Sequence, residues 1–234
     1  LELSDNNKIV GKNAQLIATG NVVEKEAVIN LVTPLQVKTN AWLDTQVGTV
    51  GNNMTISDHF SARLHHHPFI ELVNVVQMAA TDTTISSTSL FNDEVRGLKN
   101  AVTLRDIMTN YIYPNTLVVE LLTGQDIKAA LEVNASYFTL HANHQLGINT
   151  SFLEPKVQHY NYDIWSGIDY TFDFSRPVGD RVVNIMYQHV PLEMSAQYRV
   201  VMNNYRAGGA GGFTMFTTDK IVQEVQLEIP DLIG

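Results

Sequence analysis

Two segments of the chain place their apolar residues at the spacing of an amphipathic helix. Between residues 24 and 45 the apolar side chains fall mostly on one stripe, and the same period runs from Pro68 to Ala80. Pro68 stands in the first helical turn, where its missing N–H is tolerated. Pro34 lies inside the first segment and is expected to kink or divide it, because proline cannot donate the helical hydrogen bond. The pattern therefore predicts helices over residues 24–45 and 68–80.

Other segments show the alternation or the short apolar runs of β-strands. Tyr170, Phe172 and Phe174 alternate with polar residues, and strands are also predicted over residues 117–121, 181–187 and 198–203. Two short strands around an Asp-Asn-Asn turn are predicted within residues 1–10. Residues 81–90 are rich in serine and threonine, which suits a short buried strand or a loop.

Thr103 and Thr123 each precede a helical pattern, and a threonine hydroxyl can accept a hydrogen bond from the free N–H groups of a first turn. Helices are therefore predicted to begin after both threonines. Helices and strands are interspersed along the chain without an internal repeat. The predicted fold class is α+β, or mixed α/β, with a largely non-parallel sheet.

Composition and charge exclude several classes of function. The 234 residues are 44% hydrophobic and 17% charged, as in an ordinary soluble globular protein, and the net charge is −9. This charge argues against a nucleic-acid polymer as partner, because tracking a phosphate backbone needs a basic face. The absence of cysteine excludes disulfides, thiolate metal sites and a cysteine nucleophile. No apolar run approaches the roughly 20 residues of a membrane helix, so no membrane span is predicted in this chain.

Two turns place an aromatic ring beside an amide side chain. They are Tyr113-Pro114-Asn115-Thr116 and the segment that begins Asn203-Asn204-Tyr205-Arg206 and continues into glycines. Two such rings can hold a flat heteroaromatic ligand between them, at roughly 1–3 kcal/mol per stacked base. The amides can hydrogen-bond the base edge or a sugar hydroxyl. The alternative is a purely structural role, in which Tyr113 is a core aromatic and the glycines form a loose hairpin.

The glycine run at residues 208–212 is not followed by the Lys-Ser/Thr pair of a phosphate-binding loop. Its expected use is therefore close approach of the backbone to a ligand, since glycine has no Cβ.

Histidines occur in two groups that could suggest a metal site. His65, His66 and His67 are consecutive, but neighbours in sequence do not share a face of a helix or strand and rarely ligate one ion. His141 and His144 lie in a predicted surface loop. The aspartate and histidine motifs of two-metal hydrolases are absent, as is a serine-nucleophile elbow. The sequence predicts no catalytic residue and no metal ligand in this chain.

A family resemblance is carried by a series of segments in a fixed order. The chain contains Thr103-Leu104-Arg105-Asp106-Ile107, then Tyr111-Ile112-Tyr113-Pro114-Asn115-Thr116-Leu117, then Leu122-Thr123-Gly124-Gln125-Asp126-Ile127, with residues 162–170 and 203–209 following. This series resembles the C-terminal domain of the 5′-nucleotidase family. Within the family it is most similar to the 2′,3′-cyclic-nucleotide 2′-phosphodiesterase/3′-nucleotidase branch. The resemblance covers roughly residues 58–216.

The resemblance implies a two-domain organisation. Enzymes of this family have an N-terminal metallophosphatase domain with two divalent metals, and a helix leads from it to a C-terminal substrate-binding domain. By this comparison residues 1–20 are residual strands of the metallophosphatase domain, residues 21–47 are the linker helix, and residues 48–234 are the substrate-binding domain. The chain opens at Leu1 and is interpreted as a fragment without a cofactor of its own. The two metals are expected upstream.

The resemblance also implies roles for individual residues. Tyr113 and Tyr205 correspond to the two rings that sandwich the base, and Asn115 corresponds to the amide that contacts the nucleoside. The predicted substrate-binding set is completed by Asn203, Arg206, Gly208 and Gly209.

Two departures from the family pattern bear on the branch and on the phosphate side of the site. The aspartate that follows the second ring by six residues in the 5′-nucleotidase branch is replaced near Gly211, which favours the cyclic phosphodiesterase branch. The glycine-glycine-x-arginine segment is replaced by residues 90–97. Arg96 in that stretch is either the phosphate-side cation or a solvated surface arginine.

The expected function is nucleoside or nucleotide binding within a metal-dependent phosphoric-ester hydrolase. The family is typically extracytoplasmic, so a periplasmic, secreted or cell-wall location is expected, and the chain alone is expected to be inactive. The alternative is a non-catalytic nucleotide-binding or surface-adhesion module. Metallophosphatase motifs upstream of Leu1 would favour the enzyme, and their absence would favour the module.

Overall fold

The computed structural model describes residues 1–20, 22–51 and 54–234, which divide into two compact units, Leu1–Trp42 and Leu43–Gly234. The first unit contains the antiparallel pair β1 (Glu2–Leu3) and β2 (Ile9–Gly11), as predicted, and most of α1 (Glu26–Leu43). α1 continues through Pro34, so the proline does not divide the helix, and none of its side chains is buried. Residue 21, where the predicted linker begins, lies outside the described residues.

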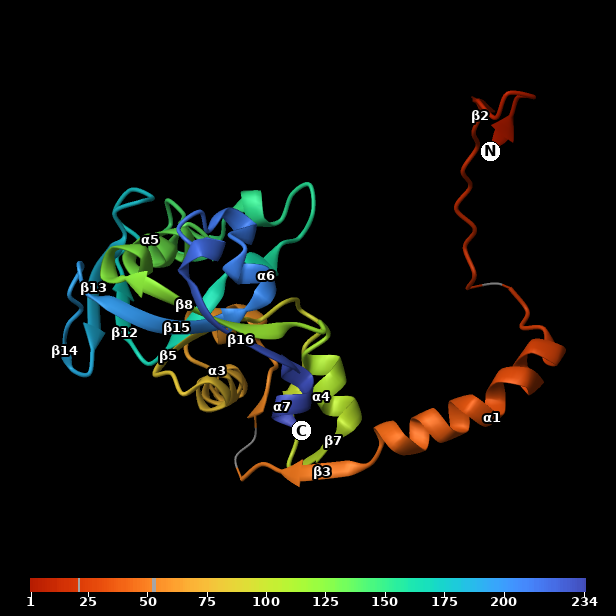
Figure 1. Ribbon diagram of the computed structural model, residues 1–234, viewed down its shortest axis with the longest axis horizontal. Helices are drawn as coiled ribbons and strands as arrows, with labels where there is room; N and C mark the ends of the chain where they lie inside the picture. Colours follow the sequence, from red (N-terminus) through yellow and green to blue (C-terminus); the bar gives the residue numbers. More distant parts are fainter. Residues whose placement is uncertain (21, 52–53) are drawn as a thin grey trace. The chain divides into compact units, whose positions relative to one another are not determined.

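The second unit holds the remaining elements (Figure 1). Its helices are α2 (His59–Leu64), α3 (Pro68–Thr81), α4 (Leu104–Asn110), α5 (Gly124–Ala135), α6 (Asn204–Ala207) and α7 (Ile229–Ile233). Its strands are β3 (Gln46–Thr49), β4 (Met54–Thr55), β5 (Ile85–Ser89), β6 (Gly97–Leu98), β7 (Ala101–Thr103), β8 (Thr116–Thr123), β9 (Phe138–Leu140), β10 (Leu146–Ile148), β11 (Asp163–Ser166), β12 (Asp169–Phe172), β13 (Val182–Tyr187), β14 (Val190–Pro191), β15 (Gln197–Asn203) and β16 (Ile221–Glu228). Short 3₁₀ helices are η1 (Thr150–Phe152), η2 (His159–Asn161), η3 (Ala210–Gly212) and η4 (Thr218–Lys220).

A five-stranded sheet organises this unit, in the order β11-β5-β15-β8-β16. β15 pairs parallel with β5, and the other neighbours pair antiparallel. A smaller antiparallel sheet, β12-β13-β14, and three two-stranded pairs surround it. The structure therefore confirms the predicted mixed class with a largely non-parallel sheet.

Helices cover both faces of the central sheet (Figure 1). The side chains of β8 alternate between the faces, as the pleat of a strand requires. Leu117 and Val119 belong to the buried cluster that contains the apolar face of α3. Val118 and Leu122 belong to the cluster that contains the apolar face of α5. The sheet is thus the middle layer of a helix–sheet–helix arrangement, and the site is built at one end of its strands.

The two predicted threonine caps are present. Thr103 accepts a hydrogen bond from the backbone N–H of Asp106, and the Asp106 carboxylate accepts one from the N–H of Thr103 in return. Thr123 and Asp126 form the same reciprocal box at the start of α5. Each box satisfies backbone donors that a first helical turn leaves free. The starts of α4 and α5 are therefore determined locally, as the sequence indicated.

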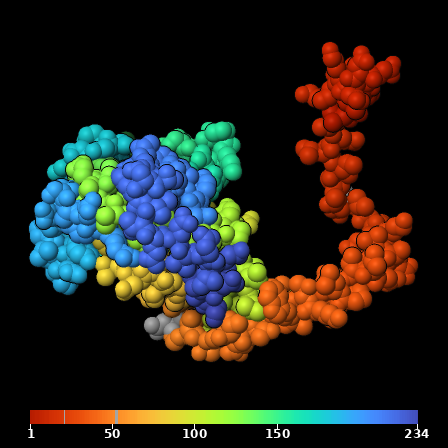
Figure 2. All heavy atoms as spheres, in the orientation of Figure 1, coloured from red at the N-terminus to blue at the C-terminus, as the bar shows by residue number. Residues whose placement is uncertain are grey.

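The C-terminal segment differs from the prediction, because β16 and α7 were not anticipated. β16 is an edge strand whose side chains are mostly exposed, so it lacks the clear apolar alternation that marks a strand. In Figure 2 the dark blue atoms of these residues lie across the visible face of the second unit. Ile229 at the start of α7 is fully buried and its N–H donates to the carbonyl of Asn115. The segment thus supports the turn that carries Asn115.

Candidate functional site

A cavity of about 220 Å³ lies where several loops meet at the ends of the central strands. Its lining residues are Phe91, Tyr113, Asn115, Lys156, Tyr160, Asn203 and Tyr205. Four of these, Tyr113, Asn115, Asn203 and Tyr205, belong to the predicted substrate-binding set. They come from the two separate turns that precede β8 and follow β15. The antiparallel pairing of those strands sets Asn203 opposite Leu117, which brings the two turns to the same end of the sheet.

Tyr113 lines the cavity. Its side chain is 39% exposed, so the ring is not a core aromatic. The ring meets the edge of Phe91, with centroids 5.1 Å apart and planes at 88°. The backbone N–H of Asn115 donates to the carbonyl of Tyr113 at 2.8 Å, which closes a tight turn around Pro114. Phe91 and this turn together hold the Tyr113 ring at the mouth of the cavity.

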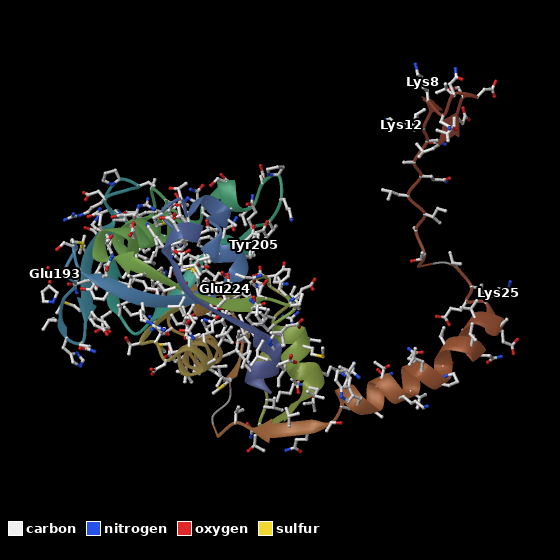
Figure 3. The ribbon with its side chains drawn as sticks, in the orientation of Figure 1. Lys8, Lys12, Lys25, Glu193, Tyr205 and Glu224 are labelled. Carbon is white, nitrogen blue, oxygen red and sulfur yellow. The ribbon has the colours of Figure 1, made fainter. Side chains whose placement is uncertain are left out.

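Tyr205 also lines the cavity, and it lies on the short helix α6 rather than in a turn as predicted (Figure 3). The strand ends at Asn203, whose Oδ1 accepts from the N–H of Arg206 at 2.9 Å and caps the short helix. The Tyr205 side chain is 51% exposed. Because Oδ1 faces a backbone N–H, the amide NH₂ of Asn203 is the group left to donate toward a ligand.

Asn115 sits beside a buried hydroxyl. The side chains of Asn115 and Thr88 face the hydroxyl of Tyr111, and burial raises the pKa of Tyr111 well above its usual value. Tyr111 is therefore neutral, and its ring packs edge-on against Phe91 at 4.8 Å. Tyr111 and Phe91 therefore support the side chains of Tyr113 and Asn115.

Arg206 does not line the cavity, although it was predicted to bind substrate. Its side chain is 1% exposed and forms a bidentate ion pair with Asp163, from Nε to Oδ2 at 2.7 Å and from Nη2 to Oδ1 at 3.0 Å. On a helix, neighbouring residues point in directions about 100° apart. Tyr205 therefore projects outward and Arg206 inward. The structure places Arg206 behind the cavity wall.

The predicted glycines and Arg96 also lie outside the cavity lining. Gly209 has φ +79° and its N–H donates to the carbonyl of Arg206, so it closes the turn after α6. Gly208 is exposed and ends α6. Arg96 is exposed, and its backbone N–H donates to Oδ1 of Asn110 at 2.8 Å. The close backbone approach expected of the glycine run occurs at Gly211, and it faces Arg206 instead of the cavity.

Three lining residues were missed by sequence reasoning: Phe91, Lys156 and Tyr160. Lys156 is the cation among the lining residues, and its Nζ lies 5.5 Å from the centroid of the Tyr160 ring. A lysine four residues before a tyrosine is a weak signal, because nothing in the local pattern indicates that a loop folds back over a distant sheet. Phe91 lies in the segment, residues 90–97, that departs from the family pattern. That departure was the only sequence signal that could have indicated its role in the cavity.

Three of the histidines considered as metal ligands, which are His67, His141 and His144, have other local positions. Nδ1 of His67 accepts from the N–H of Phe69 at 3.2 Å and caps α3. His141 and His144 belong to the exposed turn between β9 and β10. Within the described residues, no three histidine, cysteine, aspartate or glutamate side chains are grouped so that they could hold a metal ion. In the same part of the chain no helix has both the length and the apolarity needed to cross a bilayer.

Comparison with known proteins identifies the family. Residues 43–218 match the family described as "5'-nucleotidase, C-terminal domain". The chain therefore belongs to the 5′-nucleotidase C-terminal domain family. The match begins at the first residue of the second unit and ends at residue 218, before β16 and α7.

Relatives of known type agree with this membership. A 2',3'-cyclic-nucleotide 2'-phosphodiesterase/3'-nucleotidase of Haemophilus influenzae is 26% identical over 219 residues, which cover 76% of this chain and 32% of that protein. The trifunctional nucleotide phosphoesterase protein YfkN of Bacillus subtilis is 31% identical over 137 residues, 53% of this chain and 9% of that protein. The chain thus spans a third or less of these two relatives. Both are phosphoric-ester hydrolases by name.

A solved structure shares the fold closely. A candidate 5'-nucleotidase of Staphylococcus aureus, crystallised with α-ketoglutarate, superimposes with a TM-score of 0.85 at 35% identity. The superposition covers 93% of this chain and 41% of that one.

Proposed function

We propose that the second unit binds the nucleoside part of a nucleotide for a metal-dependent phosphoric-ester hydrolase. One observation carries this proposal: Tyr113 and Tyr205, from segments far apart in sequence, line the same cavity and are both partly exposed. Two partly exposed rings in a cavity that is also lined by amide side chains suit a flat base with polar edges. The ligand proposed is therefore a nucleoside or nucleotide, with its base held between the two tyrosines.

The chemistry is assigned to a separate domain. The matched region covers 32% of one relative and 9% of the other, and both hydrolyse phosphate esters, as their names state. We infer that an N-terminal metallophosphatase domain supplies the two metals, with residues 1–20 as its last strands and residues 21–47 as the connection. When bound, such metals lower the pKa of a water molecule and offset charge on phosphoryl oxygens. The present chain contributes binding that positions the phosphorus.

The location proposed is extracytoplasmic, in keeping with a role in hydrolysing external nucleotides. It rests on the family alone. A cyclic phosphodiesterase specificity is proposed because the Haemophilus influenzae relative carries the name 2',3'-cyclic-nucleotide 2'-phosphodiesterase/3'-nucleotidase.

Adenosine is expected to bind the purified chain. NMR titration should show saturable shifts centred on Tyr113, Asn115 and Tyr205. The affinity is expected to be modest, because the phosphate and metal contacts belong to the other domain. If saturating adenosine and the other common nucleosides leave the spectrum unchanged, the proposed function is wrong.

The chain alone is expected to hydrolyse neither bis-p-nitrophenyl phosphate nor a 2′,3′-cyclic nucleotide, with or without added Mn²⁺ or Zn²⁺. The physical reason is that the described residues present no cluster able to hold a metal ion. Release of p-nitrophenol or of inorganic phosphate should stay at the level of the buffer-plus-metal control. Turnover above that control would place the catalytic centre in this chain. It would contradict the proposal that catalysis belongs to a separate domain and substrate binding to this one.

A further inference from the structure

Behind the cavity, the guanidinium of Arg206 joins two segments that each carry a lining residue. Besides the bidentate pair with Asp163, Nη2 donates to the carbonyl of Tyr160 at 2.7 Å. Nη1 donates to the carbonyl of Ala210, and the guanidinium carbon lies 4.1 Å from the centroid of the Phe213 ring. Arg206 therefore connects α6, which carries Tyr205, to η2, which carries Tyr160.

Asp163 is itself fixed in the sheet. It is the first residue of β11, its side chain is 2% exposed, and its backbone N–H donates to Oδ1 of Asn134 at 3.0 Å. Oγ of Ser89, on the neighbouring strand β5, lies 2.5 Å from Asp163 Oδ1. The ion pair is thus anchored to two strands of the central sheet. A buried carboxylate held in this way gives the guanidinium a single geometry.

We propose that the buried Arg206–Asp163 pair is a positioning unit, which fixes α6 and η2 against the central sheet and thereby sets the position of Tyr205, one of the two rings proposed to hold the base. This inference rests on the proposed nucleoside binding. Arg206 acts through Tyr205 and Tyr160 and does not touch the ligand. A bidentate, planar guanidinium suits this task, because it bonds a carboxylate and a carbonyl at once in fixed directions.

The glycine at 211 is explained by the same pair. A Cβ on Gly211 would lie 2.6 Å from Nη1 of Arg206 and 2.3 Å from Oδ1 of Asn161, so a larger residue would displace the guanidinium. Gly212 offers a matched comparison, because it also has a positive φ, +88°, yet a Cβ there would meet nothing within 4 Å. The two glycines therefore share backbone strain on substitution but differ in contact with Arg206.

The first test compares Arg206→Lys with Arg181→Lys. Arg181 is also buried, and its Nη1 donates to the carbonyls of Ala135 and Phe138, but it does not line the cavity or contact a lining residue. Lysine keeps the charge but cannot bond Asp163 and Tyr160 together. Both variants should melt at a lower temperature. Only Arg206→Lys should weaken adenosine binding, by about tenfold, as expected when one of two stacking faces is misplaced.

The second test compares Gly211→Ala with Gly212→Ala, which keeps the proposal testable if Arg206→Lys does not fold. Gly211→Ala should weaken adenosine binding by about tenfold and shift a 3-fluorotyrosine resonance of Tyr205 in the ligand-free chain, whereas Gly212→Ala should do neither. Equal adenosine affinity in wild type, Arg206→Lys and Gly211→Ala would overturn the positioning role alone. Equal losses within each matched pair would also overturn it, by showing a general effect of stability. Failure of the wild type to bind any nucleoside would instead reject the proposed function.

Discussion

Replacing Tyr113 or Tyr205 with alanine is expected to weaken adenosine binding by roughly 1–3 kcal/mol for each ring, which is the range measured for base stacking on aromatic side chains. The expectation follows from the position of the rings, since both line the cavity and both are partly exposed. Tyr113→Phe and Tyr205→Phe should bind nearly as well as the wild type, because stacking needs the ring and not the hydroxyl. Calorimetric or NMR titration of the five proteins measures the effect.

The melting temperature serves as the control for these variants. Exposed aromatic residues contribute little to a core, so the Tyr205→Ala protein should melt close to the wild type. Tyr113→Ala removes an edge contact with Phe91 and is expected to melt slightly lower. Adenosine binding that is equal in wild type and both alanine variants would show that the base does not lie between these rings.

Glu120 is expected to make the free energy of unfolding depend strongly on pH. It lies in β8 between Val200 of β15 and Ile221 of β16, and its side chain is fully buried. Within residues 1–20, 22–51 and 54–234, neither carboxylate oxygen has a hydrogen-bond partner. Burial raises the pKa of Glu120 from 4.5 to about 8, with smaller contributions from the nearby Asp126 and Asp219, while Lys220 opposes the rise. Lys220 is itself bonded to Asp126 at 3.1 Å and so cannot fully neutralise Glu120.

The direction of this pH dependence follows from the proton that Glu120 binds. Between pH 4.5 and about 8 the folded chain retains a proton that the unfolded chain releases, so raising the pH through this window destabilises the fold. The loss is absent below pH 4.5 and complete above about 8. At about 1.4 kcal/mol per pKa unit it amounts to a few kcal/mol. Glu120→Gln should remove this dependence and leave the variant more stable than wild type at alkaline pH.

Denaturant unfolding at several pH values between 4 and 9 tests this expectation. Glu224→Gln is the matched control, because Glu224 is exposed on the neighbouring strand β16 and its removal changes the net charge equally (Figure 3). The control should follow the wild type across the range. A constant difference between Glu120→Gln and wild type at every pH would show that Glu120 is ionised in the folded chain or titrates normally.

Local signals in the sequence determined where several helices begin. Proline at 68 and the threonines at 103 and 123 act within a single helical turn, and all three mark the start of a helix in the structure. The resemblance indicated the family, and the family match over residues 43–218 confirms that membership. The role of the two tyrosines in binding stays a prediction, although the structure brings both rings to one cavity.

Other features were decided only by the tertiary structure. Arg206 and Tyr205 are adjacent in sequence, yet a helix of four residues turns one inward to Asp163 and the other outward. Phe91, Lys156 and Tyr160 reach the cavity because loops from distant segments meet at the ends of the central strands. Nothing in the sequence distinguishes Glu120 from other charged residues, and it is the pairing of β8 with β15 and β16 that encloses it. Capping and periodicity act over a few residues and can be recognised locally, whereas burial and the partners of a side chain depend on segments that only the folded chain brings together.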